Sequence, residues 1–230
     1  MENKLSTSLS ALALIVSVVS ATFTFKDSKR TDREQLSKAV SELIGLNQKN
    51  ITWSNIPLDK RDPSYYNEGS ILTQTVASVT RQAVYLINND PEIVNDVDYV
   101  TIAQGLFIVG GYQLSDNYRQ KAVDASPSDL YKIFNLRGYA DFLFSQGKFE
   151  QAREKYRLAL KIFNDDTDFN KTTNCYTYQM WMVSEFSKGF KSNAENNYQN
   201  ALRTCNRISD QNVKSYSLNM LNNARSYFNF

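Results

Sequence analysis

The side chains that most enzymes use for proton transfer are scarce in this chain. It has no histidine, which excludes Ser-His-Asp and Cys-His catalysis and the HExxH zinc site. It also has no Walker-type glycine loop, no nucleotide-binding fingerprint and no nucleophile elbow. Its 24 acidic residues are spread widely, so a catalytic pair of carboxylates stays open as an alternative. The sequence predicts a protein that is not an enzyme and that has no cofactor and no metal site.

One acidic stretch has part of the spacing of a calcium-binding loop. Asp166, Asp168 and Asn170 match the opening positions of an EF-hand loop. However, Lys171 stands where the loop needs glycine, and Thr177 stands where it needs a bidentate glutamate. We therefore expect a solvated loop here rather than a calcium site.

The two cysteines, Cys175 and Cys205, form no CxxC pair. In a helical hairpin the start of one helix meets the end of the next, so the two thiols could lie close together. A pair of reduced, partly buried thiols is the simpler expectation and is our prediction.

The bulk composition describes a globular protein without a strongly charged surface. Of 230 residues, 42% are hydrophobic and 22% are charged, which is enough apolar material for one large domain or two small ones. The formal net charge of +2 gives no reason to expect a polyanion-binding surface, so nucleic acid is not a predicted partner.

Residues 5–25 carry no charge and are long enough to cross a bilayer. As a helix they would span roughly 31 Å, about one hydrocarbon core. Only Lys4 and the amino terminus are positive before them, and four positive residues follow: Lys26, Lys29, Arg30 and Arg33. Because positively charged flanks tend to stay in the cytoplasm, the pattern predicts a single-pass protein of the cell membrane with a cytoplasmic body.

Two alternatives to a retained anchor stay open. Val19, Ser20 and Ala21 offer the small residues that a signal peptidase needs, so the body could instead be secreted or periplasmic after cleavage. The segment could also be the buried first helix of a soluble protein.

Two amphipathic helices are expected to follow the apolar segment. Thr31 and Glu34 have the spacing of a capping box, and the first helix should run from there to about Gln48. Its apolar face is made by Leu36, Val40, Leu43 and Ile44. Residues 49–66 are polar and contain two prolines, which indicates a connector. The stripe of the second helix is made by Leu72, Val76, Val79, Ala83 and Leu86.

These two stripes could pair two copies of the chain in a juxtamembrane coiled coil, which would make a homo-oligomer. Each stripe covers only two or three heptads, which is short for a coiled coil. We therefore predict an intramolecular helical hairpin and keep the dimer as the alternative.

Beyond Asp90 the sequence is almost entirely helical. Asp90–Pro91 and Ser126–Pro127 each place a proline after a good N-cap residue, which predicts a helix start. No alternation of β-branched residues is long enough to suggest a sheet. The sequence therefore predicts an all-α fold.

A short pattern is repeated after three glycines, Gly110, Gly147 and Gly189. After Gly147, alanine, tyrosine and alanine follow at offsets of five, nine and twelve, and the same residues recur at the same offsets after Gly189. Glycine can take the positive φ of a tight helix exit, and alanine lets two helices approach closely. On these residues the chain from position 96 onward resembles the tetratricopeptide repeat family of stacked helical hairpins.

The resemblance is closest around Gly147 and departs from the family pattern on either side. Arg119 stands where the first repeat usually has a large apolar residue. In the third repeat Met182 replaces a small residue and Glu185 replaces an apolar one, so we expect looser or shifted packing there. Residues 210–228 are predicted to form a capping helix whose inward residues are Val213, Tyr216, Leu221, Ala224 and Tyr227.

The resemblance implies a short helical-hairpin solenoid whose first helices line a groove for a partner protein or peptide. The groove candidates at the matching positions are Gln104, Phe107, Arg137, Asp141, Phe144, Gln179, Val183 and Phe186. The three phenylalanines at equivalent positions suggest an apolar floor. The implied function is a membrane-anchored interaction module, with a structural scaffold or assembly subunit as the alternative.

The predicted organisation has four parts. They are an N-terminal tail (1–4), a transmembrane helix (5–25), juxtamembrane helices with a linker (26–90), and tetratricopeptide-like repeats with a C-terminal capping helix (91–230).

Overall fold

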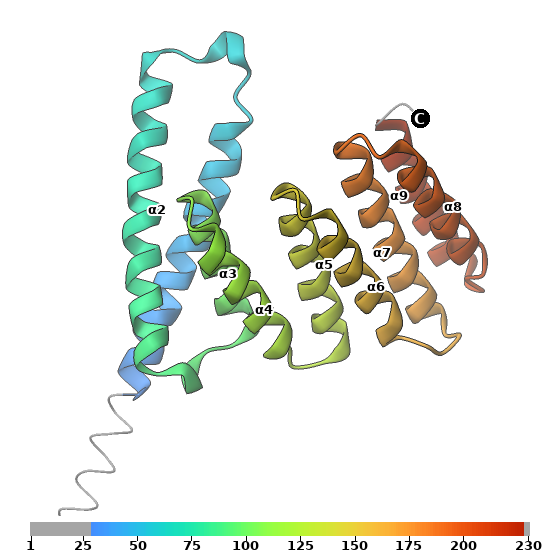
Figure 1. Cartoon of the computed structure of the whole chain (residues 1–230), viewed down its shortest axis with the longest axis horizontal. Helices are drawn as coiled ribbons and strands as arrows, with labels where there is room; N and C mark the ends of the chain where they lie inside the picture. Colours follow the sequence, from blue (N-terminus) through green and yellow to red (C-terminus); the bar gives the residue numbers. More distant parts are fainter. Residues whose placement is uncertain (1–28, 228–230) are drawn as a thin grey trace, which may run out of the picture. The chain divides into compact units, whose positions relative to one another are not determined.

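The structure is a computed structural model that describes residues 29–227, and within this range it contains helices and no strand (Figure 1). Residues 29–54 are helical and are followed by η1 (Leu58–Lys60), α2 (Pro63–Asn89), η2 (Pro91–Ile93), α3 (Asp96–Ile108), α4 (Tyr112–Asp124), α5 (Asp129–Ser145), α6 (Phe149–Ile162), α7 (Asp168–Ser187), α8 (Lys191–Asn206) and α9 (Gln211–Tyr227). The predicted all-α class is confirmed for these residues.

The predicted tail (1–4) and transmembrane helix (5–25) lie outside the described residues. None of the helices in the range 29–227 is both long and apolar enough to cross a membrane.

The chain divides into two compact units, of which the first ends at Tyr118 and the second begins at Arg119. The division falls inside α4, so it does not coincide with the boundary expected at residue 90. The first unit contains the two long helices and α3, and the second contains α5 to α9.

In the first unit, aromatic packing fixes the loop between the two long helices. Trp53 stacks on Tyr65 with ring centroids 4.4 Å apart, and its indole N–H donates to the carbonyl oxygen of Tyr65 at 3.0 Å. The indole lies so close to Gly69 that a Cβ added there would come within 2.1 Å of it. Residue 69 must therefore be glycine if Trp53 is to close the hairpin in this way.

The apolar stripes of the two long helices are buried within the single chain, as expected for an intramolecular hairpin. The buried members are Leu36, Val40, Leu43, Val76, Val79, Ala83 and Leu86. Two predicted members are exceptions, since Leu72 is only half-buried and Ile44 is 49% exposed. The fourth apolar position of the first helix is taken by Leu46, which is buried.

The helix boundaries of the first unit differ from the predicted ones. The first helix is already helical at residue 29 and continues to residue 54, so the capping box at Thr31 does not start it and the connector is shorter than expected. The second helix begins at Pro63, because the Asp62 carboxylate caps it by accepting from the Tyr65 N–H at 3.1 Å.

The Asp90–Pro91 pair was predicted to start a long helix, but it starts only the single turn η2. The helix α3 begins at Asp96, where Asn95 and Asp98 form a reciprocal capping box. The signal for a helix start was correct within a few residues, but the residue that caps α3 was missed.

Three helices end on the repeated glycines in the left-handed conformation. Gly110, Gly147 and Gly189 have φ angles of 82°, 74° and 81°. In each case the N–H that follows the glycine donates to a carbonyl five residues earlier, at 2.8, 3.0 and 3.0 Å. This is the long hydrogen bond of a Schellman motif. The predicted role of the three glycines is therefore confirmed.

In the second unit α5 packs on α6, and α7 packs on α8. Ala152 and Ala159 of α6, and Ala194 and Ala201 of α8, are fully buried where the helices meet. These are the small residues of the repeated pattern, and their size permits the close approach.

Met182 and Glu185 do not loosen the third hairpin, contrary to expectation. Both side chains are fully buried. Met182 packs in the α7–α8 core beside residues such as Tyr198. The Glu185 carboxylate receives two hydrogen bonds from the Arg153 guanidinium, at 2.7 and 2.8 Å. The prediction failed because this partner comes from α6, 32 residues away in sequence.

Cys175 and Cys205 form a disulfide that joins α7 to α8, with their Cα atoms 5.5 Å apart. The prediction of reduced thiols was therefore wrong. The hairpin geometry brings the first half of α7 against the last turn of α8, and both cysteines are buried there.

The inward face of α9 also differs from the predicted one. Leu221 is fully buried, and Leu218 and Ala224 pack against the α7–α8 core. Val213 and Tyr216 are 37% and 67% exposed, so they do not face inward. The Tyr227 side chain and Phe228 lie outside the described structure.

The acidic stretch before α7 is largely exposed and ties this helix to the turn before α9. The Asp168 carboxylate accepts from the backbone N–H groups of Ser209 and Asp210 at 2.8–2.9 Å, and these bonds lower its pKa. Asp166 pairs with Lys171 and Arg207. Asp166 and Asp168 thus have their partners within the protein.

Candidate binding groove

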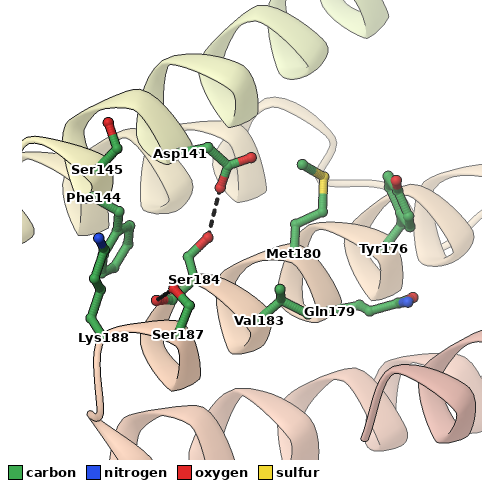
Figure 2. Close-up of a pocket in the computed structure, with 10 residues that line it drawn as sticks. All are labelled: Asp141, Phe144, Ser145, Tyr176, Gln179, Met180, Val183, Ser184, Ser187 and Lys188. Atoms are coloured by element: carbon green, nitrogen blue, oxygen red, sulfur yellow. Dashed lines mark hydrogen bonds between the residues drawn. The ribbon is translucent and has the colours of Figure 1, made fainter. Parts of the chain in front are cut away.

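Two clefts open along the same side of the second unit. The first has a volume of about 450 Å³ and lies between α5 and α7 (Figure 2). It is lined by Asp141, Phe144, Ser145, Tyr176, Gln179, Met180, Val183, Ser184, Ser187 and Lys188. In Figure 2, Tyr176 and Lys188 lie at opposite ends of this set of side chains.

The second cleft, of about 370 Å³, is bounded by α5, α7 and α9. Its lining residues are Arg137, Thr172, Thr173, Cys175, Tyr176, Gln179, Tyr216, Ser217 and Met220. Tyr176 and Gln179 line both clefts, so the two are neighbours. We call them together the α5–α7–α9 groove.

Most of the predicted groove residues on α5 and α7 line this groove. They are Arg137, Asp141, Phe144, Gln179 and Val183. Phe186 lies on α7 but packs against the α7–α8 core and is not among the lining residues. Gln104 and Phe107 lie on α3, in the first unit, and do not belong to the groove.

The expected apolar floor of three phenylalanines does not form. Phe144 is only 2% exposed and packs against Phe149 and Tyr156, with ring centroids 5.9 and 6.3 Å away. It is therefore chiefly a core residue whose edge reaches the groove.

A buried hydrogen-bond network surrounds Asp141 at the base of the first cleft. Tyr156 and Ser184 donate from their hydroxyls to the same carboxylate oxygen, at 2.5 and 2.6 Å, and Figure 2 shows the bond from Ser184. Burial raises the pKa of Asp141, and the two hydrogen bonds oppose this shift. The network joins α5, α6 and α7 and so fixes the shape of the cleft.

The sequence did not predict the exposed side chains that give the groove its character. Tyr176, Tyr216 and Met220 are 45%, 67% and 39% exposed and belong to α7 and α9. The helix α9 was expected to be a cap with Tyr216 facing inward. Tyr216, Ser217 and Met220 of α9 all line the groove, and their spacing in the sequence could have predicted a third lining helix.

Within residues 29–227, no group of three or more side chains could hold a metal ion. No protein-family model, curated protein or solved structure matches this chain. The function must therefore be argued from the groove itself.

Proposed function

We propose that the second unit is a protein-interaction module that binds a segment of a partner protein in the α5–α7–α9 groove. The groove carries the proposal. It combines exposed tyrosine and methionine with a buried arginine, and these residue types are enriched in protein interfaces. Its two neighbouring clefts can receive different side chains of one bound segment.

The proposal includes a finer description of the fold as a divergent tetratricopeptide-like solenoid. The three helices that end on a glycine with positive φ support it, as do the fully buried alanines of α6 and α8. The helix α9 would cover the end of the solenoid with Leu218 and Leu221 while adding Tyr216 to the groove.

We also propose that residues 5–25 attach this module to a membrane, as the sequence predicts. The flanking charges predict a cytoplasmic body, but we propose the opposite orientation, with the body on the exported side of the membrane. The Cys175–Cys205 disulfide favours the exported side of the membrane, because disulfides persist in oxidising compartments. A reporter enzyme that is active only after export, fused after Phe230, tests this. We expect activity, and an inactive export reporter with an active cytoplasmic one would contradict the assignment.

The groove is tested best at Tyr176, which is exposed and lines both clefts. Replacing Tyr176 by a photo-reactive phenylalanine in the full chain should give a discrete cross-linked product with a partner in native membranes. Tyr85 of α2 is 65% exposed and lies in the first unit, so the same replacement there is the matched control. Equal products from both positions, or none from Tyr176, would contradict the groove assignment.

The scaffold alternative is favoured by one observation in the first unit. Ile51, Leu58 and Tyr66, in and beside the loop of the long hairpin, are 60%, 78% and 66% exposed. If these three side chains form one patch, such a patch is typical of a surface covered in an assembly. If the full chain self-associates and Leu58→Asp abolishes this association, scaffolding becomes the better description.

A further inference from the structure

Arg137 lies at the base of the second cleft and is only 2% exposed. Its Nε donates to the Thr177 hydroxyl at 2.9 Å, and its Nη2 donates to the same hydroxyl at 2.6 Å and to the Thr173 carbonyl at 2.5 Å. The guanidinium also stacks near Tyr176 and Phe134, 5.0 and 5.6 Å from the ring centroids. Its position is thus fixed by α7 and by its own helix.

This buried guanidinium has no counter-charge in the described part of the chain. No carboxylate of residues 29–227 lies within 4.0 Å of it to form a salt bridge, and Asp141, one turn along α5, bonds to Tyr156 and Ser184 instead. Burial lowers the pKa of Arg137 to about 10, so the group is still charged at neutral pH. A buried, unpaired charge is costly, and proteins normally pair it.

One nitrogen of the guanidinium is available to a ligand. Nε and Nη2 make the three hydrogen bonds described above, whereas Nη1 makes none with the described residues. The cleft wall beside it is formed by Tyr176, Tyr216 and Met220. The site therefore offers a positive donor at the bottom and apolar surface around it.

We propose that this cleft is a subsite for an acidic side chain of the partner, and that Arg137 pairs with its carboxylate. The inference rests on the proposed function and adds the chemistry of the bound segment. The aromatic and methionine walls favour a large apolar residue two positions from the acidic one, since the two share a face in an extended segment. An aspartate or glutamate within an extended, otherwise apolar segment would fit both clefts.

The test uses the full chain in a mild detergent and two peptides blocked at both ends. Each has seven residues, with phenylalanine at positions two and six and alanine elsewhere. The central residue is glutamate in one peptide and glutamine in the other. Calorimetric titration should show that the glutamate peptide binds about ten- to hundredfold more tightly, the usual gain from a charge-assisted hydrogen bond. A third peptide, with central glutamine and a free C-terminal carboxylate, should bind no better than the blocked glutamine peptide.

Arg137→Met should abolish the preference for glutamate without lowering the melting temperature, because it removes an unpaired buried charge. Arg157→Met is the matched control, since Arg157 is exposed on α6 and should leave the preference intact. Equal affinity for the two blocked peptides, tighter binding of the free-carboxylate peptide, or a large fall in the melting temperature of Arg137→Met overturns the subsite. If the two blocked peptides bind equally well and Tyr176→Ala abolishes the binding of both, the subsite is overturned while the groove assignment stays in place.

Discussion

Removing the disulfide should destabilise the second unit strongly. The bond between Cys175 and Cys205 closes a loop with a sequence separation of 30 residues. Loop-closure entropy for that separation corresponds to about 3.5 kcal/mol at 25 °C. For a unit of about a hundred residues, this free energy lowers the melting temperature by about 15 °C. Scanning calorimetry of the full chain, with and without reductant, measures the shift directly.

The control separates the cross-link from the packing of the two cysteines. Both side chains are buried, so each alanine substitution also removes packing. Cys175→Ala and Cys205→Ala should each cost nearly as much as the double variant, because either one removes the same bond. Two free thiols in the native protein, or identical melting of oxidised and reduced chains, would refute the reasoning.

Three further perturbations test the fold and the base of the groove. Gly147→Ala should lower the free energy of unfolding by about 1–2 kcal/mol, because φ is 74° there. Gly138 lies inside α5 with open space around it, so Gly138→Ala should raise this free energy by about 0.5–1 kcal/mol. Changes of the same sign in urea unfolding would contradict this prediction. Arg153→Met should lower the free energy of unfolding by about 3–5 kcal/mol in the same assay, because it leaves the buried Glu185 carboxylate without its cation. Adding Glu185→Gln should recover part of this stability. No recovery would argue against a stabilising ion pair. Burial raises the pKa of Asp141, so the folded state holds the proton of this carboxyl more tightly than the unfolded state does. The free energy of unfolding should therefore fall as pH rises from the ordinary carboxyl pKa through the raised one. Asp141→Asn should remove that fall, and the same pH profile of urea unfolding in wild type and variant would contradict this prediction.

Local signals in the sequence identified the hairpins well. A glycine that ends a helix needs a positive φ, and an alanine at a crossing needs only to be small. Both properties belong to the residue itself, which is why Gly110, Gly147 and Gly189 were assigned correctly. The burial of Val76, Val79 and Ala83 followed in the same way from spacing along one helix.

Properties that depend on partners distant in sequence were missed. Glu185 looked like a defect until Arg153 of the preceding hairpin was seen to satisfy it. The cysteines looked like separate thiols because their proximity depends on how α7 meets α8. Tyr216 was predicted to face inward but is exposed. The periodicity of a sequence shows which residues share a face of a helix, but not which face packs against a neighbouring helix.

The sequence alone determined that this protein is helical and where its repeated turns lie, since those features depend on local conformational preference. The tertiary structure decided that α5, α7 and α9 share one groove and that Arg137 lies in it without a carboxylate partner. The reason is physical: the burial and pairing of a charge depend on every element packed around it. On the basis of this one buried guanidinium, we propose a partner segment that carries a negative charge.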